Sequence, residues 1–228
     1  MVCCFCCLPG EEALARPPLI EAQSAVDEAH EVPRHAKDTQ LPQEPVPGAC
    51  YTVGVDVDPY GTPLGITFDL MDGFVCAVAR ISPMSLIAAW NQKCSGQEVV
   101  RPRDRLLKVN GQGGDGERLA KALAQGLHEP GAHALLVFQH PVVSSVSIAK
   151  EGTALGLSLH YAADNMLGGL CVKSVGSGLV KERGLAIRAG HRIMDVDGEK
   201  TVNKMLERMR RNEAFSLTVI SWPEDGAK

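Results

Sequence analysis

The chain has 228 residues, a formal net charge of −4 and a pI near 6.0, with 45% hydrophobic and 22% charged residues. This composition is ordinary for a globular protein, and the length allows one or two domains. The slightly acidic charge argues against a general nucleic-acid binder, which would carry a basic face. The sequence lacks an apolar run of about 20 residues that could span a bilayer, and its start does not resemble a secretory signal. We therefore expect a cytoplasmic protein.

Four of the eight cysteines lie close together, at Cys3, Cys4, Cys6 and Cys7. Structural zinc would need a second pair of cysteines elsewhere, and no helix N-terminus or base is placed to activate a redox thiol. Exposed cysteines near a membrane are sites of S-acylation (palmitoylation), and two or more acyl chains give stable anchoring. We interpret residues 1–10 as a lipid-anchor segment at the cytoplasmic face of a membrane. An unmodified tail is the alternative.

The other four cysteines show no regular spacing, so they do not form a disulfide framework. Cys76 and Cys171 lie within apolar runs and are interpreted as small core residues. Residues 11–49 contain six prolines among many charged residues. Few apolar side chains are available there to offset the entropy of ordering, which predicts a flexible linker.

From residue 51 onward, short strand-like runs alternate with turns and helical segments. Alternating apolar residues and flanking turn signals predict five strands, at residues 52–57, 65–70, 75–81, 105–109 and 134–138. A helix is predicted over residues 83–91, with Ser82 as its N-cap and Pro83 as its first residue, and a second over residues 117–125.

The same order of elements then repeats. Strands are predicted at residues 146–149, 155–160, 170–175, 192–196 and 215–220. A short helix is predicted at residues 178–183 and an amphipathic helix at residues 202–210. Two units of about 90 residues therefore share one element order, which is a stronger signal than any single element.

Two motifs occur in both units. One is a Leu-Gly loop before the second strand, Pro63-Leu64-Gly65-Ile66 and again Ala154-Leu155-Gly156-Leu157. The other is the run that leads into the fourth strand and its turn, at residues 100–111 and 187–198. Together these motifs resemble the markers of PDZ domains. The resemblance implies an α+β fold with mostly β content: two tandem PDZ-like partly open β-barrels or sandwiches, each capped by two helices. It covers residues 50–141 and 142–223, preceded by a disordered N-terminal segment.

The resemblance also implies a binding mode. A partner peptide adds to the edge of the second strand, and N–H groups of the loop hold its terminal carboxylate. Glycine in the loop permits the close backbone approach. The candidate peptide-binding residues are Pro63, Leu64, Gly65, Ile66, Gly116 and Ala120 in the first unit, and Lys150, Ala154, Leu155, Gly156, Leu157, Val202 and Leu206 in the second.

The two units differ at the loop. In the family, a basic side chain four residues before the loop helps to hold the carboxylate, and Lys150 stands there in the second unit. Pro63 removes one N–H donor from the first loop. We therefore expect the second unit to bind a free C-terminus better than the first. On the long helices, Met205 and Met209 are expected to face the core.

No histidine-based metal motif and no nucleophile elbow is present. We expect a non-enzymatic adaptor or scaffold, without cofactor or metal, whose partners are protein C-termini or internal peptide segments. The alternative is a structural double module that packs on itself, or regulates a protease or other enzyme partner, without binding free peptide.

Overall fold

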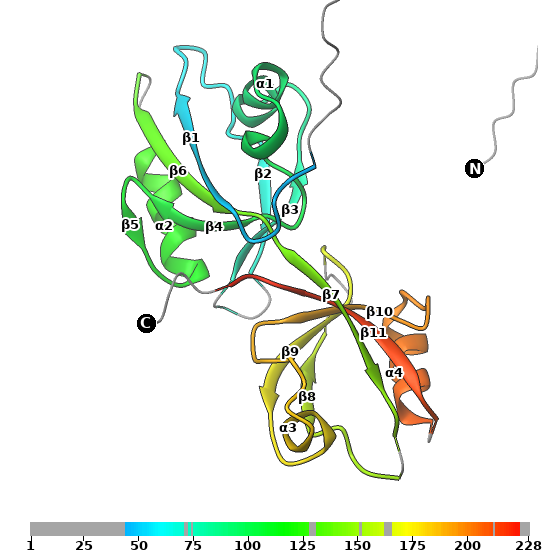
Figure 1. Cartoon of the computed structure of the whole chain (residues 1–228). Helices are drawn as coiled ribbons and strands as arrows, with labels where there is room; N and C mark the ends of the chain where they lie inside the picture. The colour runs from blue at the N-terminus through cyan, green and yellow to red at the C-terminus, as the bar shows by residue number, and fades with distance from the viewer. Residues whose placement is uncertain are drawn as a thin grey trace, which may run out of the picture. The chain divides into compact units, whose positions relative to one another are not determined.

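The computed structural model of the chain describes residues 44–70, 73, 75–127, 131–150, 152–161, 166–211 and 213–223. The predicted anchor segment and the predicted linker up to residue 43 lie outside this part of the chain. The described residues belong to one compact unit, Gln40–Lys228. They are mostly β, with two antiparallel sheets and few helices (Figure 1).

The first sheet and its helices, here called the first sheet unit, extend over residues 50–139. The strands are β1 (Cys50–Asp56), β2 (Ile66–Asp69), β3 (Cys76–Ile81), β4 (Arg105–Val109), β5 (Gln112–Gly113) and β6 (His133–Gln139). The helices are α1 (Leu86–Lys93), the 3₁₀ helix η1 (Gly96–Glu98) and α2 (Gly116–Gly126). The strand order is β1-β6-β4-β3-β2, with β5 paired to β4, so β2 lies at an edge of the sheet.

The second sheet and its helices, the second sheet unit, extend over residues 142–221. The strands are β7 (Val142–Ile148), β8 (Leu157–His160), β9 (Leu170–Val175), β10 (Arg192–Val196) and β11 (Phe215–Ser221). The helices are α3 (Leu179–Glu182) and α4 (Val202–Arg210). The order β7-β11-β10-β9-β8 repeats that of the first sheet, which confirms the predicted repetition of elements. No helix in the described residues is long and apolar enough to cross a bilayer.

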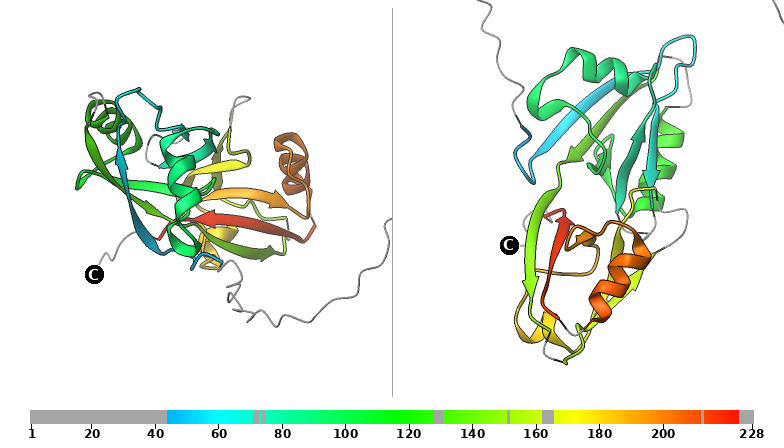
Figure 2. Two further views of the ribbon diagram at one scale, coloured as in Figure 1. Left: turned by 90° about the horizontal axis from the view of Figure 1, so that it is seen from above. Right: turned by 90° about the vertical axis from the view of Figure 1, so that its right-hand side faces the viewer.

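Each sheet unit has its own hydrophobic core, built from alternate residues of its strands and one face of its long helix. In β1 the alternation buries Tyr51, Val53 and Val55 and leaves the residues between them more exposed. In α2 and α4 the helical spacing buries Leu119 and Leu123, and Met205 and Met209. Helix α2 lies against β3 and β4, and α4 lies against β10 (Figure 2). The interpretation of Cys76 and Cys171 as core residues is confirmed, since both are fully buried.

The predicted start of α1 is wrong. The helix begins at Leu86, and its N-cap is Ser85, whose Oγ accepts a hydrogen bond from Ala88 N at 3.1 Å. Ser82 instead donates its backbone N–H to Gly65 O, which continues the pairing of β2 with β3. Met84 has a φ of 55°, a left-handed conformation that a helix starting at Pro83 could not contain.

The two sheet units are joined by only His140 and Pro141, between β6 and β7. Residues 44–49, which the sequence analysis includes in the flexible linker, are hydrogen-bonded to this region. Gly48 N donates to His140 O, and the side chain of Gln97 bonds to Val46 N and to Glu44 O. The end of the predicted linker is therefore an ordered part of the fold.

Candidate functional site: the groove between β2 and α2

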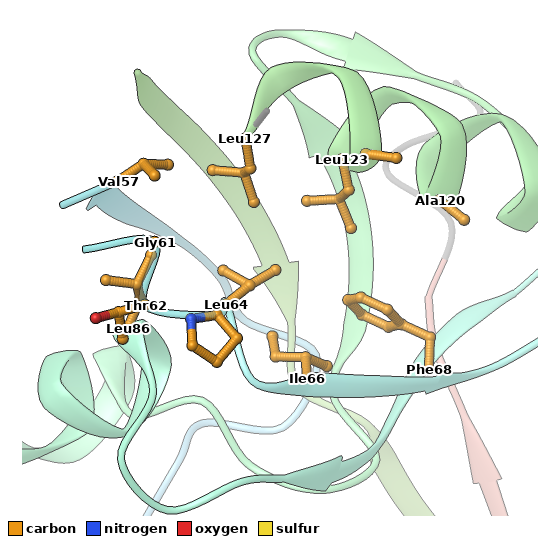
Figure 3. A pocket seen from close by; sticks show the side chains of 12 residues that line it. Val57, Gly61, Thr62, Leu64, Ile66, Phe68, Leu86, Ala120, Leu123 and Leu127 are labelled. Atoms are coloured by element: carbon orange, nitrogen blue, oxygen red, sulfur yellow. The ribbon is translucent and has the colours of Figure 1, made fainter. Parts of the chain in front are cut away.

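A groove of about 510 Å³ lies between the free edge of β2 and helix α2. Figure 3 shows Ile66 and Phe68 on β2 facing Ala120, Leu123 and Leu127 on the helix side. The remaining lining residues come from the β1–β2 loop, from α1 and from α2: Val57, Gly61, Thr62, Pro63, Leu64, Leu86 and Ala124. Every lining side chain except that of Thr62 is apolar or absent, so the groove suits an apolar ligand.

The loop before β2 is fixed by three hydrogen bonds to its carbonyl groups. Pro63 O accepts from Leu86 N, Leu64 O accepts from Ile87 N, and Gly65 O accepts from Ser82 N. The first two bonds satisfy N–H groups in the first turn of α1, which have no partner within the helix. The Leu-Gly loop is therefore a capping structure for α1.

These bonds also decide where the loop N–H groups point. In a planar trans peptide, the C=O of one residue and the N–H of the next point in opposite directions. Because the three carbonyls face α1 and β3, the N–H groups of Leu64, Gly65 and Ile66 face away from them. Within the described residues, the N–H groups of Leu64 and Gly65 have no hydrogen-bond acceptor. Three adjacent donors directed to one side can hold an anionic or carbonyl oxygen.

This arrangement corrects the expected effect of Pro63. The N–H that Pro63 lacks belongs to the peptide plane that it shares with Thr62, and the three donors described above come from the next three residues. Pro63 therefore leaves those donors in place, and its side chain lines the groove.

The second sheet unit repeats the bonds of the loop. Ala154 O accepts from Leu179 N, Leu155 O from Val180 N, and Gly156 O from Gly176 N. By the same peptide geometry, the N–H groups of residues 155–157 face away from α3 and β9. The two loops thus present equivalent sets of donors.

The glycines in these loops have a structural cause. Gly65 and Gly156 have φ values of 78° and 76°, where a side chain is strained. A Cβ on Gly65 would lie 2.0 Å from Ser85 Cβ, and a Cβ on Gly156 would lie 2.5 Å from Ser177 O. Each loop is therefore pressed against the segment that starts the next helix. The close approach that the sequence analysis attributes to a ligand is made by the protein itself.

The long helices place the other candidate residues. Ala120 lines the groove, whereas Gly116 is buried against the turn between β2 and β3 and donates its N–H to Gly73 O. Leu123 contributes to both the core and the groove. Leu127 and Ala124 line the groove and were not expected there; the four-residue spacing from Ala120 to Ala124 is a signal that could have identified the latter.

In the second sheet unit, Val202 and Leu206 on α4 are partly buried and pack against the core, as do Leu155 and Leu157. Lys150 contacts neither its loop nor an acidic partner among the described hydrogen bonds. Its Nζ donates to Met209 O at 3.0 Å and to Arg210 O at 3.3 Å. The ammonium group therefore caps the C-terminal end of α4, a position that the helix dipole favours.

A buried polar cluster, separate from the groove, lies at the start of β1 and just before β4. Asp104 accepts from Tyr51 Oη at 2.5 Å and from Arg101 N at 2.7 Å, and its Oδ1 lies 2.8 Å from His140 Nδ1. His140 Nε2 lies 2.9 Å from Gln97 O, which can only accept, so Nε2 carries a hydrogen. One further proton must lie between Nδ1 and the carboxyl group.

Burial raises the pKa of Asp104 above its usual value, although the bonds from Tyr51, His140 and Arg101 act in the opposite direction. Burial, and then the charge of Asp104, raises the pKa of Tyr51. Sequence analysis missed the pairing of His140 with an acidic residue, because the two are 36 positions apart. Within the described residues, no group of His, Cys, Asp and Glu side chains could hold a metal ion.

No family model and no curated protein matches the chain. Solved structures that are similar to it include two complexes of INAD PDZ45. A complex of INAD PDZ45 with NORPA CC-PBM matches with a TM-score of 0.34 and 16% identity, over 82% of this chain and 100% of that one. INAD PDZ45 in complex with an NG2 peptide matches with a TM-score of 0.34 and 15% identity, over 83% of this chain and 98% of that one. A TM-score at this level does not establish a shared fold.

Proposed function

We propose that the chain is a non-enzymatic adaptor with two PDZ-like domains, residues 50–141 and 142–223, and that the first binds an extended peptide segment along β2. The observation that carries this proposal is the apolar groove between α2 and β2, which lies at the edge of the sheet that the described residues form. A strand at a sheet edge offers N–H and C=O groups to an added strand, and an adjoining groove accepts every second side chain of that strand.

The geometry of the groove indicates the ligand class. Ala120 and Ala124 are small, so the space between α2 and β2 accepts a large apolar side chain. The N–H groups of Leu64, Gly65 and Ile66 lie at the start of β2, where they would receive a peptide carboxylate or an internal carbonyl. Among the described residues, no cationic side chain lines the groove. The N–H groups would therefore supply the attraction for a carboxylate.

The competing function is a structural double module that packs on itself without binding peptide. Contacts between the two sheet units support its first half, since Asp69 and Arg192 form a buried ion pair. All residues that line the groove, however, lie within positions 57–127. No described residue of the second sheet unit lines the groove, which favours the adaptor.

We also propose that Cys3, Cys4, Cys6 and Cys7 are S-acylated and attach the adaptor to the cytoplasmic face of a membrane. The support is the sequence: four thiols within five positions exceed the two acyl chains needed for stable anchoring.

The peptide function is tested by selecting ligands from a peptide library with the full chain and measuring affinity by fluorescence polarisation. Ala124 lines the groove and is exposed, so Ala124→Arg should obstruct the groove without disturbing the core. We expect it to weaken binding by about tenfold or more, equivalent to about 1.4 kcal/mol. Gln125→Arg places the same side chain at the next exposed position, outside the groove, and should bind as the unaltered protein does.

Two results separate the alternatives. Equal affinity of Ala124→Arg and Gln125→Arg would exclude this groove as the binding site. Selection of no ligand by the unaltered chain would favour the structural module. Amidating the C-terminus of a selected peptide reports on the loop donors: a loss of affinity assigns them to a carboxylate, and unchanged affinity assigns them to an internal segment.

A further inference from the structure

The last residue of β2, the strand that borders the groove, forms a buried ion pair with a residue of the second sheet unit. Asp69 is the last residue of β2 and is 3% exposed, and Arg192, the first residue of β10, is 2% exposed. Arg192 Nη1 donates to Asp69 Oδ2 at 2.9 Å, and Nη2 donates to Oδ1 at 3.3 Å. This fork-like contact fixes the orientation of the carboxylate as well as its position. Leu167 N donates to Asp69 Oδ2 at 3.3 Å, so a second group of the same sheet unit holds it.

A cluster of apolar side chains adjoins this ion pair. Val75 and Ala77 next to and on β3 pack with Ile220 and Trp222 in a buried cluster, together with Leu167 and Met194. Strand pairing places Asp69 opposite Ala77, and Arg192 opposite Ile220. The charges are thus neighbours of the cluster. A carboxylate without its partner in such surroundings is strongly disfavoured, because it keeps the cost of leaving water.

The position of Asp69 connects this contact to the groove. Phe68, the residue before it, lines the groove, and Ile66 lies at the other end of the same four-residue strand. Among the described strands, β2 pairs with β3 alone, and their pairing is interrupted by a bulge between Thr67 and Phe68. A bulge locally disrupts the ladder of hydrogen bonds. Beyond the bulge, the anchor at Asp69 is therefore important for holding Phe68 in place.

We infer that Arg192 is a positioning residue for the groove of the first sheet unit: it holds Asp69, and thereby the half of β2 that carries Phe68. The shape of the groove thus depends on the neighbouring sheet unit, although none of the described residues of that unit lines it. This inference rests on the proposed peptide function for its effect on binding, and on the ion pair alone for its effect on β2.

The decisive measurement is hydrogen exchange of β2 amides in the full chain without peptide. Arg192→Met keeps the length of the side chain and removes the charge. We expect exchange at Phe68 and Asp69 to accelerate by about tenfold or more, because this end of β2 would open locally. Gln139→Met is the matched control: it removes another contact between the first sheet unit and the chain after β11, the 2.8 Å bond from Gln139 Nε2 to Pro223 O. Gln139 does not belong to the apolar cluster beside the ion pair, so this change should leave β2 exchange unchanged.

A second variant guards against general unfolding. In Asp69→Leu with Arg192→Met both charges are removed and apolar groups replace them, an exchange that proteins often tolerate. It should restore slow exchange in β2. Equal β2 exchange in Arg192→Met and Gln139→Met, or equally fast exchange throughout both sheets in Arg192→Met, would overturn the inference.

Peptide affinity supplies the functional readout. A peptide selected on the unaltered chain should bind Arg192→Met about tenfold more weakly and Gln139→Met as well as the unaltered chain. Accelerated β2 exchange with unchanged affinity would also overturn the positioning role. If the unaltered chain binds no peptide, the proposed function fails, and hydrogen exchange still decides whether Arg192 holds β2.

Discussion

At the scale of single residues, the loop glycines are set by the fold before any ligand is considered. Gly156 combines a left-handed φ with a Cβ position 2.5 Å from Ser177 O, whereas Gly184 has a φ of 60° and no atom within 4 Å of its Cβ position. Both positions impose conformational strain on alanine, but only Gly156 adds a backbone clash. We expect Gly156→Ala to lower the free energy of unfolding by about 1–3 kcal/mol more than Gly184→Ala, the usual cost of overpacking. Urea denaturation of both variants measures the difference, and equal losses would contradict it.

The buried carboxyl group of Asp104 predicts a dependence of stability on pH. Its pKa in the folded protein lies above the unfolded value because of burial. Its contribution to stability is therefore complete below the unfolded pKa of about 3.9 and is lost as the pH rises through the folded pKa. The free energy of unfolding of the unaltered chain, minus that of Asp104→Asn, should decrease as the pH rises from about 4 to 8. Glu117→Gln, at an exposed position, is the control. If this difference in the free energy of unfolding stays constant or increases with pH, ionisation of the Asp104 carboxyl group does not destabilise the fold, and the prediction is wrong.

At the scale of elements, the start of α1 shows that the N-cap is Ser85 and not Ser82, the residue that the local sequence pattern predicted. Ser85 Oγ accepts from Ala88 N and donates to Ser82 O, and the side chain is buried. We expect Ser85→Ala to cost about 1 kcal/mol of stability, the typical value of an N-cap. Ser82→Ala keeps the backbone bond of Ser82 to Gly65 and should cost less. Thermal unfolding of the two variants ranks them, and the reverse order would restore Ser82 as the cap.

Elements with strong local patterns could be predicted from the sequence. The strands β4, β9 and β10 and the helix α4 have the predicted bounds, because apolar alternation or helical spacing is terminated by clear turn residues. The short strand β5 and the 3₁₀ helix η1 lack such patterns. The Leu-Gly loops were located from the sequence, but the groove also needs Phe68, Ala124 and Leu127, which form one surface only after β2 and α2 pack. The ion pair of Asp69 with Arg192 joins residues 123 positions apart, beyond the reach of local patterns.

At the scale of the whole molecule, the proposed S-acylation of the N-terminal cysteines predicts where in the cell the chain is found. In a eukaryotic cell, the full chain should partition to membranes, and a variant with Cys3, Cys4, Cys6 and Cys7 all changed to Ser should not. Each acyl methylene contributes about 0.8 kcal/mol, so a single Cys→Ser change should have little effect while two or more chains remain. Fractionation before and after hydroxylamine, which cleaves thioesters, measures this. A cytosolic unaltered chain, or a membrane fraction that resists hydroxylamine, would contradict acylation; Cys50→Ser and Cys94→Ser are controls.

The two-residue connection between β6 and β7 has a mechanical consequence. His140 is 1% exposed, and its backbone bonds to Gly48 and Ala49 while its ring bonds to Asp104 and Gln97. A long connection would act as a slack tether and absorb a pull by straightening. Here, a force applied to either sheet unit acts directly on the hydrogen bonds of His140, because the connection has no slack. A peptide bound in the groove would therefore be connected to the second sheet unit through a stiff joint. A force on that peptide would reach the second sheet unit without first extending a flexible linker.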